Sequence, residues 1–227
     1  SKRKLGKDKK GGIGVNAQYR RIENFPLTVS PYVSLLNGIV SYQPSFSRQA
    51  SYRMLARYQA AAQFLGEQAY QAEIIYSLNK KTSFQANYSD IKTLDGNQLF
   101  SEKYIKAERK INKKWKGKVG VQSVIYNQPI YEGKDASKYD NVETITPFVE
   151  VTYKINRKNS IRFESQYLQT EQDLGSFYHG ILEWNSSPKF SVAISDMVNT
   201  EPVREINPTL ANQVLHYPSL FVKYNVK

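Results

Sequence analysis

Residues 143–197 alternate apolar and polar side chains through four stretches, and this alternation constrains the fold more than any other feature of the chain. In the first stretch Ile145, Val149 and Tyr153 share one side, while Thr146 and Glu150 share the other. The pattern returns in three further stretches, at 161–167, 177–184 and 190–195. Because successive side chains of a strand point to opposite faces, each stretch predicts a strand with one apolar and one polar face.

A soluble antiparallel sheet packed on a core would show the same alternation. Three features favour a membrane barrel instead. Ions such as Arg162 and Glu164 lie on the polar side, and the stretches run about 9 to 11 residues, enough to cross a bilayer at a tilt. Aromatic residues also mark the ends of the apolar side, as in interfacial girdles: Tyr153, Tyr167, Tyr178, Trp184 and Phe190. The expected fold class is therefore all-β, an antiparallel transmembrane β-barrel of the outer-membrane type.

The remaining segments extend this pattern to about eleven strands. Residues 51–64 suit a strand or a helix equally well, and we assign a strand because the neighbouring segments are strands. Single-chain bacterial barrels normally have an even number of strands. We therefore expect residues 1–227 to form a single outer-membrane β-barrel domain that is part of a larger barrel.

The net charge of +12 would also suit a protein that binds nucleic acid. Its distribution favours a body with two different rims instead. All charged residues of the short connections are basic: Lys80, Lys81, Lys113, Lys114, Lys116, Lys118, Lys154, Arg157, Lys158 and Lys189. The longer connections, 90–101, 127–142, 170–175 and 196–213, carry ten acidic residues against four basic ones.

Residues 23–49 form a long irregular segment with three prolines and no sustained period. A segment of this length inside a domain is usually functional or disordered. Its apolar side chains need burial, so we expect it to plug the barrel or to dock a partner on a rim. The residues concerned are Phe25, Leu27, Tyr32, Leu35, Tyr42 and Phe46.

Several short motifs resemble an uncharacterised family of outer-membrane β-barrel proteins from Bacteroidota. They include Glu23-Asn24-Phe25-Pro26-Leu27, Ser41-Tyr42-Gln43-Pro44-Ser45-Phe46 and Gln166-Tyr167-Leu168-Gln169-Thr170. The likeness spans residues 13–227. It implies a barrel in the bacterial outer membrane with possible protein partners, and it implies no chemistry, because the family has none assigned.

Polar residues expected to face the barrel lumen are Glu73, Gln85, Glu150, Arg162, Glu164, Gln166, His179 and Glu183. Carboxylates so close to Arg162 predict salt bridges rather than an acid–base pair. The absence of cysteine excludes disulfides, thiolate metal sites and a cysteine nucleophile, and the two histidines lie far apart in the sequence. We expect no enzyme, no cofactor and no metal site.

Three functions remain open. The first is a structural or interaction barrel within a cell-surface or secretion complex, with outer-membrane lipid and other complex proteins as partners. The second is a porin-like diffusion channel lined by the lumen-facing residues. The third is a soluble basic β protein that binds nucleic acid or polysaccharide. The first is favoured over the channel, because an irregular apolar segment inside the lumen would obstruct flow. We expect no nucleic acid as a partner.

Overall fold

The computed structural model describes residues 11–25, 32, 44–62, 66–201 and 213–226. They form one antiparallel sheet of ten strands and one short helix, α1, at Gln128–Glu132. No helix in this part of the chain is long and apolar enough to cross a membrane. The strands are β1 Gly12–Glu23, β2 Gly66–Asn79, β3 Thr82–Lys92, β4 Gln98–Lys110, β5 Trp115–Asn127, β6 Asn141–Lys154, β7 Asn159–Leu168, β8 Ser176–Ser186, β9 Phe190–Glu201 and β10 Leu215–Tyr224.

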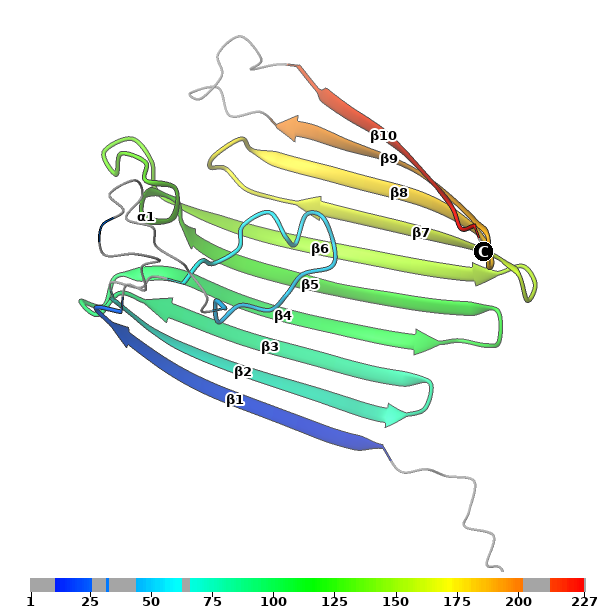
Figure 1. Cartoon of the computed structure of the whole chain (residues 1–227), viewed down its shortest axis with the longest axis horizontal. Helices are drawn as coiled ribbons and strands as arrows, with labels where there is room; N and C mark the ends of the chain where they lie inside the picture. The colour runs from blue at the N-terminus through cyan, green and yellow to red at the C-terminus, as the bar shows by residue number, and fades with distance from the viewer. Residues whose placement is uncertain (1–10, 26–31, 33–43, 63–65, 202–212, 227) are drawn as a thin grey trace, which may run out of the picture.

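The strands follow one another across the sheet in chain order, so every pairing is between sequence neighbours (Figure 1). Within the described residues, β1 pairs only with β2 and β10 only with β9. The predicted all-β antiparallel class is confirmed. The sheet itself is not closed into a barrel, and both of its edges are open.

The strand predicted at 51–64 is wrong, and the described residues hold ten strands rather than eleven. Residues 52–57 form turns instead, with the Ala56 amide donating to the Tyr52 carbonyl at 3.0 Å. Met54, Leu55 and Tyr58 are buried, as the competing helical spacing would have them. The alternation of Tyr52, Met54 and Tyr58 misled the prediction because this segment packs on the sheet and does not join it.

The two faces of the sheet differ, and we define them by the segment 44–62. The inner face is the one that this segment crosses, and the outer face is the opposite one (Figure 1). Thr146, Phe148 and Glu150 of β6 lie on the inner face and are buried, whereas Ile145 and Val149 lie on the outer face and are exposed. The alternation predicted for β6 is therefore confirmed.

The two ends of the sheet also differ. Four tight turns, which join β2 to β3, β4 to β5, β6 to β7 and β8 to β9, lie together at one end of the sheet, which we call the short-turn end (Figure 1). We call the opposite end the long-connection end. The predicted basic and acidic rims follow this division in part. Lys116 and Lys118, which were expected in a short connection, lie within β5. Asp90 and Asp196, which were expected in longer connections, lie within β3 and β9, because the strands are longer than the alternation indicated.

The main hydrophobic cluster lies between the inner face and the segment, toward the long-connection end. Met54 and Tyr58 from the segment pack there against Phe100, Tyr126 and other strand residues, each of them buried. Burying a side chain of this size contributes about 1.5–3 kcal/mol before the entropy of ordering it is subtracted. The segment 44–62 thus supplies part of the core and is not a surface loop.

Candidate functional site

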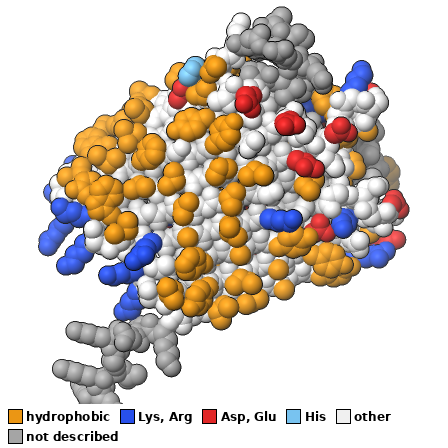
Figure 2. All heavy atoms as spheres, turned by 180° about the vertical axis from the view of Figure 1, so that it is seen from behind, with side chains coloured by type: hydrophobic (Ala, Val, Ile, Leu, Met, Phe, Trp, Pro, Cys, Tyr) orange, Lys and Arg blue, Asp and Glu red, His pale blue; other side chains and the backbone are white. Residues whose placement is uncertain are grey.

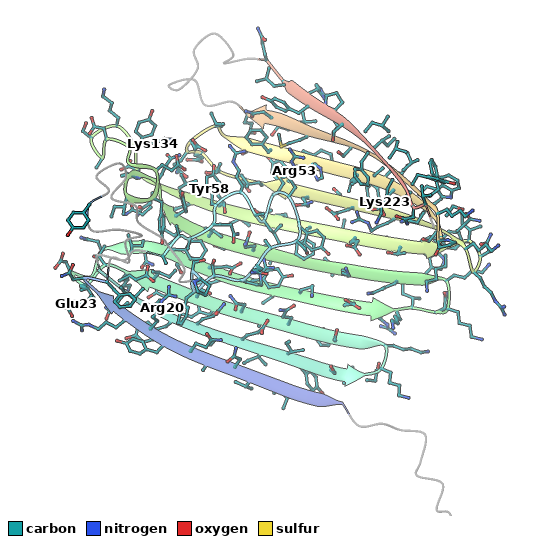
Figure 3. All side chains as sticks on the ribbon, in the orientation of Figure 1. Arg20, Glu23, Arg53, Tyr58, Lys134 and Lys223 are labelled. Carbon is teal, nitrogen blue, oxygen red and sulfur yellow. The ribbon has the colours of Figure 1, made fainter. Side chains whose placement is uncertain are left out.

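Polar side chains of the inner face hold the segment 44–62 at separate points along its length. Figure 3 shows side chains of the segment, among them Arg53 and Tyr58, lying over the sheet. We call residues 44–62 the inner segment. Its contacts with β4–β8 and with the β7–β8 connection make up the candidate site.

The first contact is centred on Glu102 of β4, which is fully buried. The Arg48 guanidinium lies 3.3 Å from the Glu102 carboxylate and 3.7 Å from the centroid of the Tyr104 ring. Gln122 and Asn87 donate to the same carboxylate at 2.7 and 3.2 Å. The Arg48 backbone amide also donates to this carboxylate, at 3.3 Å. The buried charge of Glu102 is thus both paired and hydrogen-bonded, and Glu102 is an attachment point for Arg48.

An aromatic stack lies beside this ion pair. The Tyr52 ring centroid is 4.5 Å from that of Phe148, and Phe148 stacks on Tyr104 at 6.1 Å. Gly120 makes room for the stack, because a Cβ at this position would lie 2.7 Å from atoms of the Phe148 ring. The absence of a side chain on β5 therefore lets the inner segment approach the sheet closely.

The second contact is a charge cluster that runs across β5–β8. Arg162 pairs with Glu164, and with Glu183 at 2.6 Å, while Lys118 pairs with Glu150 at 2.8 Å. The Tyr52 hydroxyl donates to Glu150 at 3.1 Å and so ties the inner segment to the cluster. The predicted salt bridges around Arg162 are confirmed.

Side-chain amides of the sheet satisfy the backbone of the inner segment directly. The Met54 amide donates to the Gln166 side chain at 2.8 Å, and the Gln122 side chain donates to the Leu55 carbonyl at 3.3 Å. A buried backbone group without a partner costs free energy, and a segment outside the sheet cannot use strand pairing to avoid that cost. Gln122 and Gln166 replace the missing strand partners.

The third contact lies at the long-connection end, around Asp173 of the β7–β8 connection. The Tyr58 hydroxyl and the Gln128 side chain donate to its carboxylate, each at 2.9 Å, and Arg57 lies 3.5 Å away. Burial alone would raise the pKa of Asp173, but hydrogen bonds from Gln128 and Tyr58 and the charges of Arg57 and Lys134 lower it below its usual value. One carboxylate thereby joins the inner segment to α1 and to β7–β8.

Asp173→Asn is expected to lower the free energy of unfolding by about 1–3 kcal/mol at neutral pH, as for a hydrogen-bonded charged group. The folded-state pKa is depressed, so this contribution is complete above the unfolded pKa of about 3.9 and is lost as pH falls through the lower folded value. Urea unfolding of both proteins at a series of pH values measures the difference. Asp95→Asn, in the exposed β3–β4 loop, is the control. A difference that stays constant into strong acid would contradict the assignment.

The predicted lumen-facing residues all lie on the inner face. Those of β6–β8 form one connected group, in which Gln166 also contacts His179 at 3.2 Å. Glu73 and Gln85 form a separate pair at 2.5 Å, nearer the short-turn end. Sequence reasoning missed Arg48, Tyr52, Glu102 and Asp173, because their partners are distant in the chain and no local pattern marks them.

Of the residues predicted to plug the barrel or dock a partner, Phe46 packs against the main hydrophobic cluster. The Arg20 guanidinium of β1 lies 4.4 Å from its ring centroid. Phe25 and Tyr32 are exposed in the described residues. Leu27, Leu35 and Tyr42 lie outside the described residues.

The two histidines lie on opposite faces of the sheet. His179 is buried on the inner face, whereas His216 lies on the outer face of β10, 2.7 Å from the Asp196 carboxylate of β9. The pairing of β9 with β10 brings Asp196 to His216, which sequence spacing had not indicated. The described residues contain no group of three or more acidic, histidine or cysteine side chains placed to hold a metal ion.

The outer face carries an apolar belt across β2–β8, which we define as its outward residues between two aromatic rows. Ile74, Ile105, Val149, Phe163 and Leu182 are each more than a third exposed there. Most outward positions of the belt are apolar, and Lys103 of β4, which lies beside Tyr88 of β3 and Ser123 of β5, is a charged side chain on the same face. Figure 2 shows this face, with hydrophobic side chains over much of it and basic side chains gathered along one edge.

Aromatic side chains border the belt on both sides. At the short-turn end Trp115 packs on Tyr153 at 4.5 Å and Trp184 on Phe190 at 5.8 Å between ring centroids. Toward the long-connection end Tyr19 packs on Tyr70 at 4.9 Å, and Tyr167 pairs with Tyr178. Tyr76 of β2 stacks on Phe84 in the row at the short-turn end. Tyr70 and Tyr76 on β2, like Tyr178 and Trp184 on β8, are six positions apart, about 20 Å along the strand.

Residues 4–227 match the family model described as "Family of unknown function (DUF6029)". Searches of curated proteins and of solved structures found no match.

Proposed function

Because the chain belongs to the family of unknown function DUF6029, we propose its function from its own structure. The sheet is the wall of a transmembrane β-barrel in the bacterial outer membrane, and the inner segment obstructs the barrel. The protein acts as a structural or interaction component of a cell-surface or secretion complex, not as an enzyme. The resemblance to Bacteroidota barrels agrees with this location.

The apolar belt carries the proposal. A soluble protein rarely exposes a contiguous apolar patch larger than a few hundred Å², whereas the lipid-facing side of a barrel is apolar and bordered by aromatic girdles. The belt lies opposite the inner segment, so the charge cluster of Arg162 is on the side that a barrel would enclose. Lipid is the partner that fits this surface.

A barrel wall also explains the open edges. Unpaired backbone groups are not tolerated in the hydrocarbon region, so β1 and β10 must each find a further pairing partner in the membrane. The two strands run in opposite directions, which allows them to pair with one another or with additional strands.

The inner segment favours a scaffold over a channel. Its Arg48 and Tyr52 contact the buried carboxylates of Glu102 and Glu150, and its Tyr58 donates to the partly buried carboxylate of Asp173. Its apolar side chains are part of the core. A segment attached in this way does not leave the lumen without breaking several buried contacts. The obstruction would therefore be permanent, which suits an interaction barrel.

A porin-like channel is the second candidate, and one observation favours it. Toward the short-turn end the inner-face residues Glu73, Lys106 and Glu108 remain partly exposed. Such residues could line a water-filled vestibule, and the inner segment alone would then decide whether ions pass.

Spin labels test the membrane assignment directly, since the chain has no native cysteine to interfere. Labels attached at Phe163→Cys and Leu182→Cys are expected to collide with oxygen dissolved in lipid and to be shielded from a water-soluble nickel complex. A label at Ser137→Cys, in the exposed connection before β6, should show the reverse. Belt labels that meet the nickel complex as readily as Ser137→Cys would overturn the proposal, and so would a protein that stays monodisperse without detergent.

A further inference from the structure

Three of the four tight turns at the short-turn end repeat one sequence, Asn followed by two basic residues: Asn79-Lys80-Lys81, Asn112-Lys113-Lys114 and Asn156-Arg157-Lys158. In each turn the Asn side chain accepts hydrogen bonds from the amides two and three residues later, at 2.8–3.0 Å. The Asn side chain thus shapes the turn and leaves both basic side chains at its tip. The repeat gives the three turns the same shape and the same charge.

Backbone hydrogen bonds hold neighbouring turns side by side. The Lys154 amide donates to the Lys114 carbonyl at 2.9 Å, and the Ser187 amide donates to the Lys158 carbonyl at 2.8 Å. The Lys110 amide donates to the Lys81 carbonyl in the same way, at 2.8 Å. Successive turns are two strands apart, about 10 Å. The basic side chains therefore form an ordered row and not a set of independent loops.

Lys113, Lys114, Lys154, Arg157 and Lys158 surround a concavity of about 490 Å³ on this row, a volume within the range of small-molecule sites. Among the described residues, no Asp or Glu lines it. Within the described part of the chain none of these five residues forms an ion pair, and all are exposed. Five cations held together without a counter-ion attract a ligand of high negative charge.

The position of the row identifies the ligand. Trp115 directly follows Lys114, and the aromatic row of Trp115, Tyr153, Trp184 and Phe190 lies where a membrane–water interface would be. Basic side chains just beyond such a row reach the level of lipid headgroups. We propose that the row of basic turns, centred on the concavity, binds the phosphate groups of anionic phospholipids. This inference rests on the proposed membrane location.

Tryptophan fluorescence measures the proposed contact, because both tryptophans of the chain, Trp115 and Trp184, lie beside the row. The protein is reconstituted in phosphatidylcholine vesicles that contain a small fraction of lipid with brominated chains, which quench nearby tryptophan. Brominated phosphatidylglycerol is expected to quench about fivefold more effectively than the same fraction of brominated phosphatidylcholine, the enrichment expected from one basic residue near an anionic surface. Equal quenching by the two lipids would overturn the inference alone, whereas no quenching by either would overturn the membrane location itself.

A matched pair of variants assigns the effect to the row. Lys113→Gln/Lys114→Gln/Arg157→Gln/Lys158→Gln should bring the ratio close to one, and it keeps Asn112 and Asn156, which shape the turns. Arg21→Gln/Lys92→Gln/Lys103→Gln/Lys138→Gln removes the same charge away from the row and should leave the ratio unchanged. Equal ratios in the two variants would contradict the assignment.

Inorganic phosphate distinguishes a lipid headgroup from a free phosphorylated ligand. An excess of phosphate should lower the preference no more than sodium chloride of equal ionic strength. A loss of preference specific to phosphate would show that the concavity takes a soluble phosphate compound, and the lipid assignment would then be wrong.

Discussion

Replacing residues 46–60 with a glycine–serine linker of equal length is expected to turn a barrel that blocks ions into one that conducts. The replacement removes Arg48, Tyr52 and Tyr58 and leaves Glu102 and Glu150 facing water. The measurement is single-channel current in a planar bilayer. We expect no resolved current steps from the unaltered protein and frequent, long-lived steps from the linker variant.

A linker that replaces residues 135–140, in the exposed connection before β6, is the control and should not conduct. A milder variant, Arg48→Ala/Tyr58→Phe, should produce brief openings, because it removes the side-chain contacts to Glu102 and Asp173 and keeps the apolar contacts of the Tyr58 ring. An unaltered protein that conducts as a wide, steady pore would favour the porin-like function. A silent linker variant would show that the inner segment is not the obstruction.

The second large effect is expected from a charge placed in the apolar belt. Val149→Arg should destabilise the vesicle-inserted protein, lowering its free energy of unfolding by about 2–4 kcal/mol if position 149 lies near the bilayer midplane. Val149 is suited to the test because it lies on the outer face of β6, 37 % exposed, and makes no polar side-chain contact that the substitution would remove.

Glu143→Arg is the matched control, since it lies on the same strand and the same face, six residues nearer the long-connection end. At an interface the same arginine should cost about 0–1 kcal/mol. Urea titration of vesicle-inserted protein gives both values. Equal costs at the two positions would mean that the belt does not lie in a hydrocarbon layer.

The sequence alone determined which residues of each strand share a face. Ile145, Val149 and Tyr153 were assigned to one face of β6, and Thr146 and Glu150 to the other, as the structure has them. This succeeds because the side-chain period of a strand is a local property of the backbone. The pairing of β6 with β7 and of β8 with β9 also follows from local sequence, because a short turn places the second strand beside the first.

The tertiary structure alone decided the path of the inner segment. The alternation of Tyr52, Met54 and Tyr58 is as regular as that of a real strand, yet these residues lie across the sheet. Their partners, Glu150, Gln166 and Asp173, are separated from them by 98 to 115 residues of sequence. A local pattern contains no information about such partners.

The same distinction applies to two sets of ion pairs on the inner face. The Arg162 cluster could be predicted, since Glu164 lies two residues away and Glu183 on the next strand. The Arg48–Glu102 pair could not, since it joins an irregular segment to a strand 54 residues later. Periodicity assigns a side chain to a face of its own strand, but only the packing of one segment on another decides which distant charge it meets, because that choice depends on the burial and hydrogen bonding of both segments together.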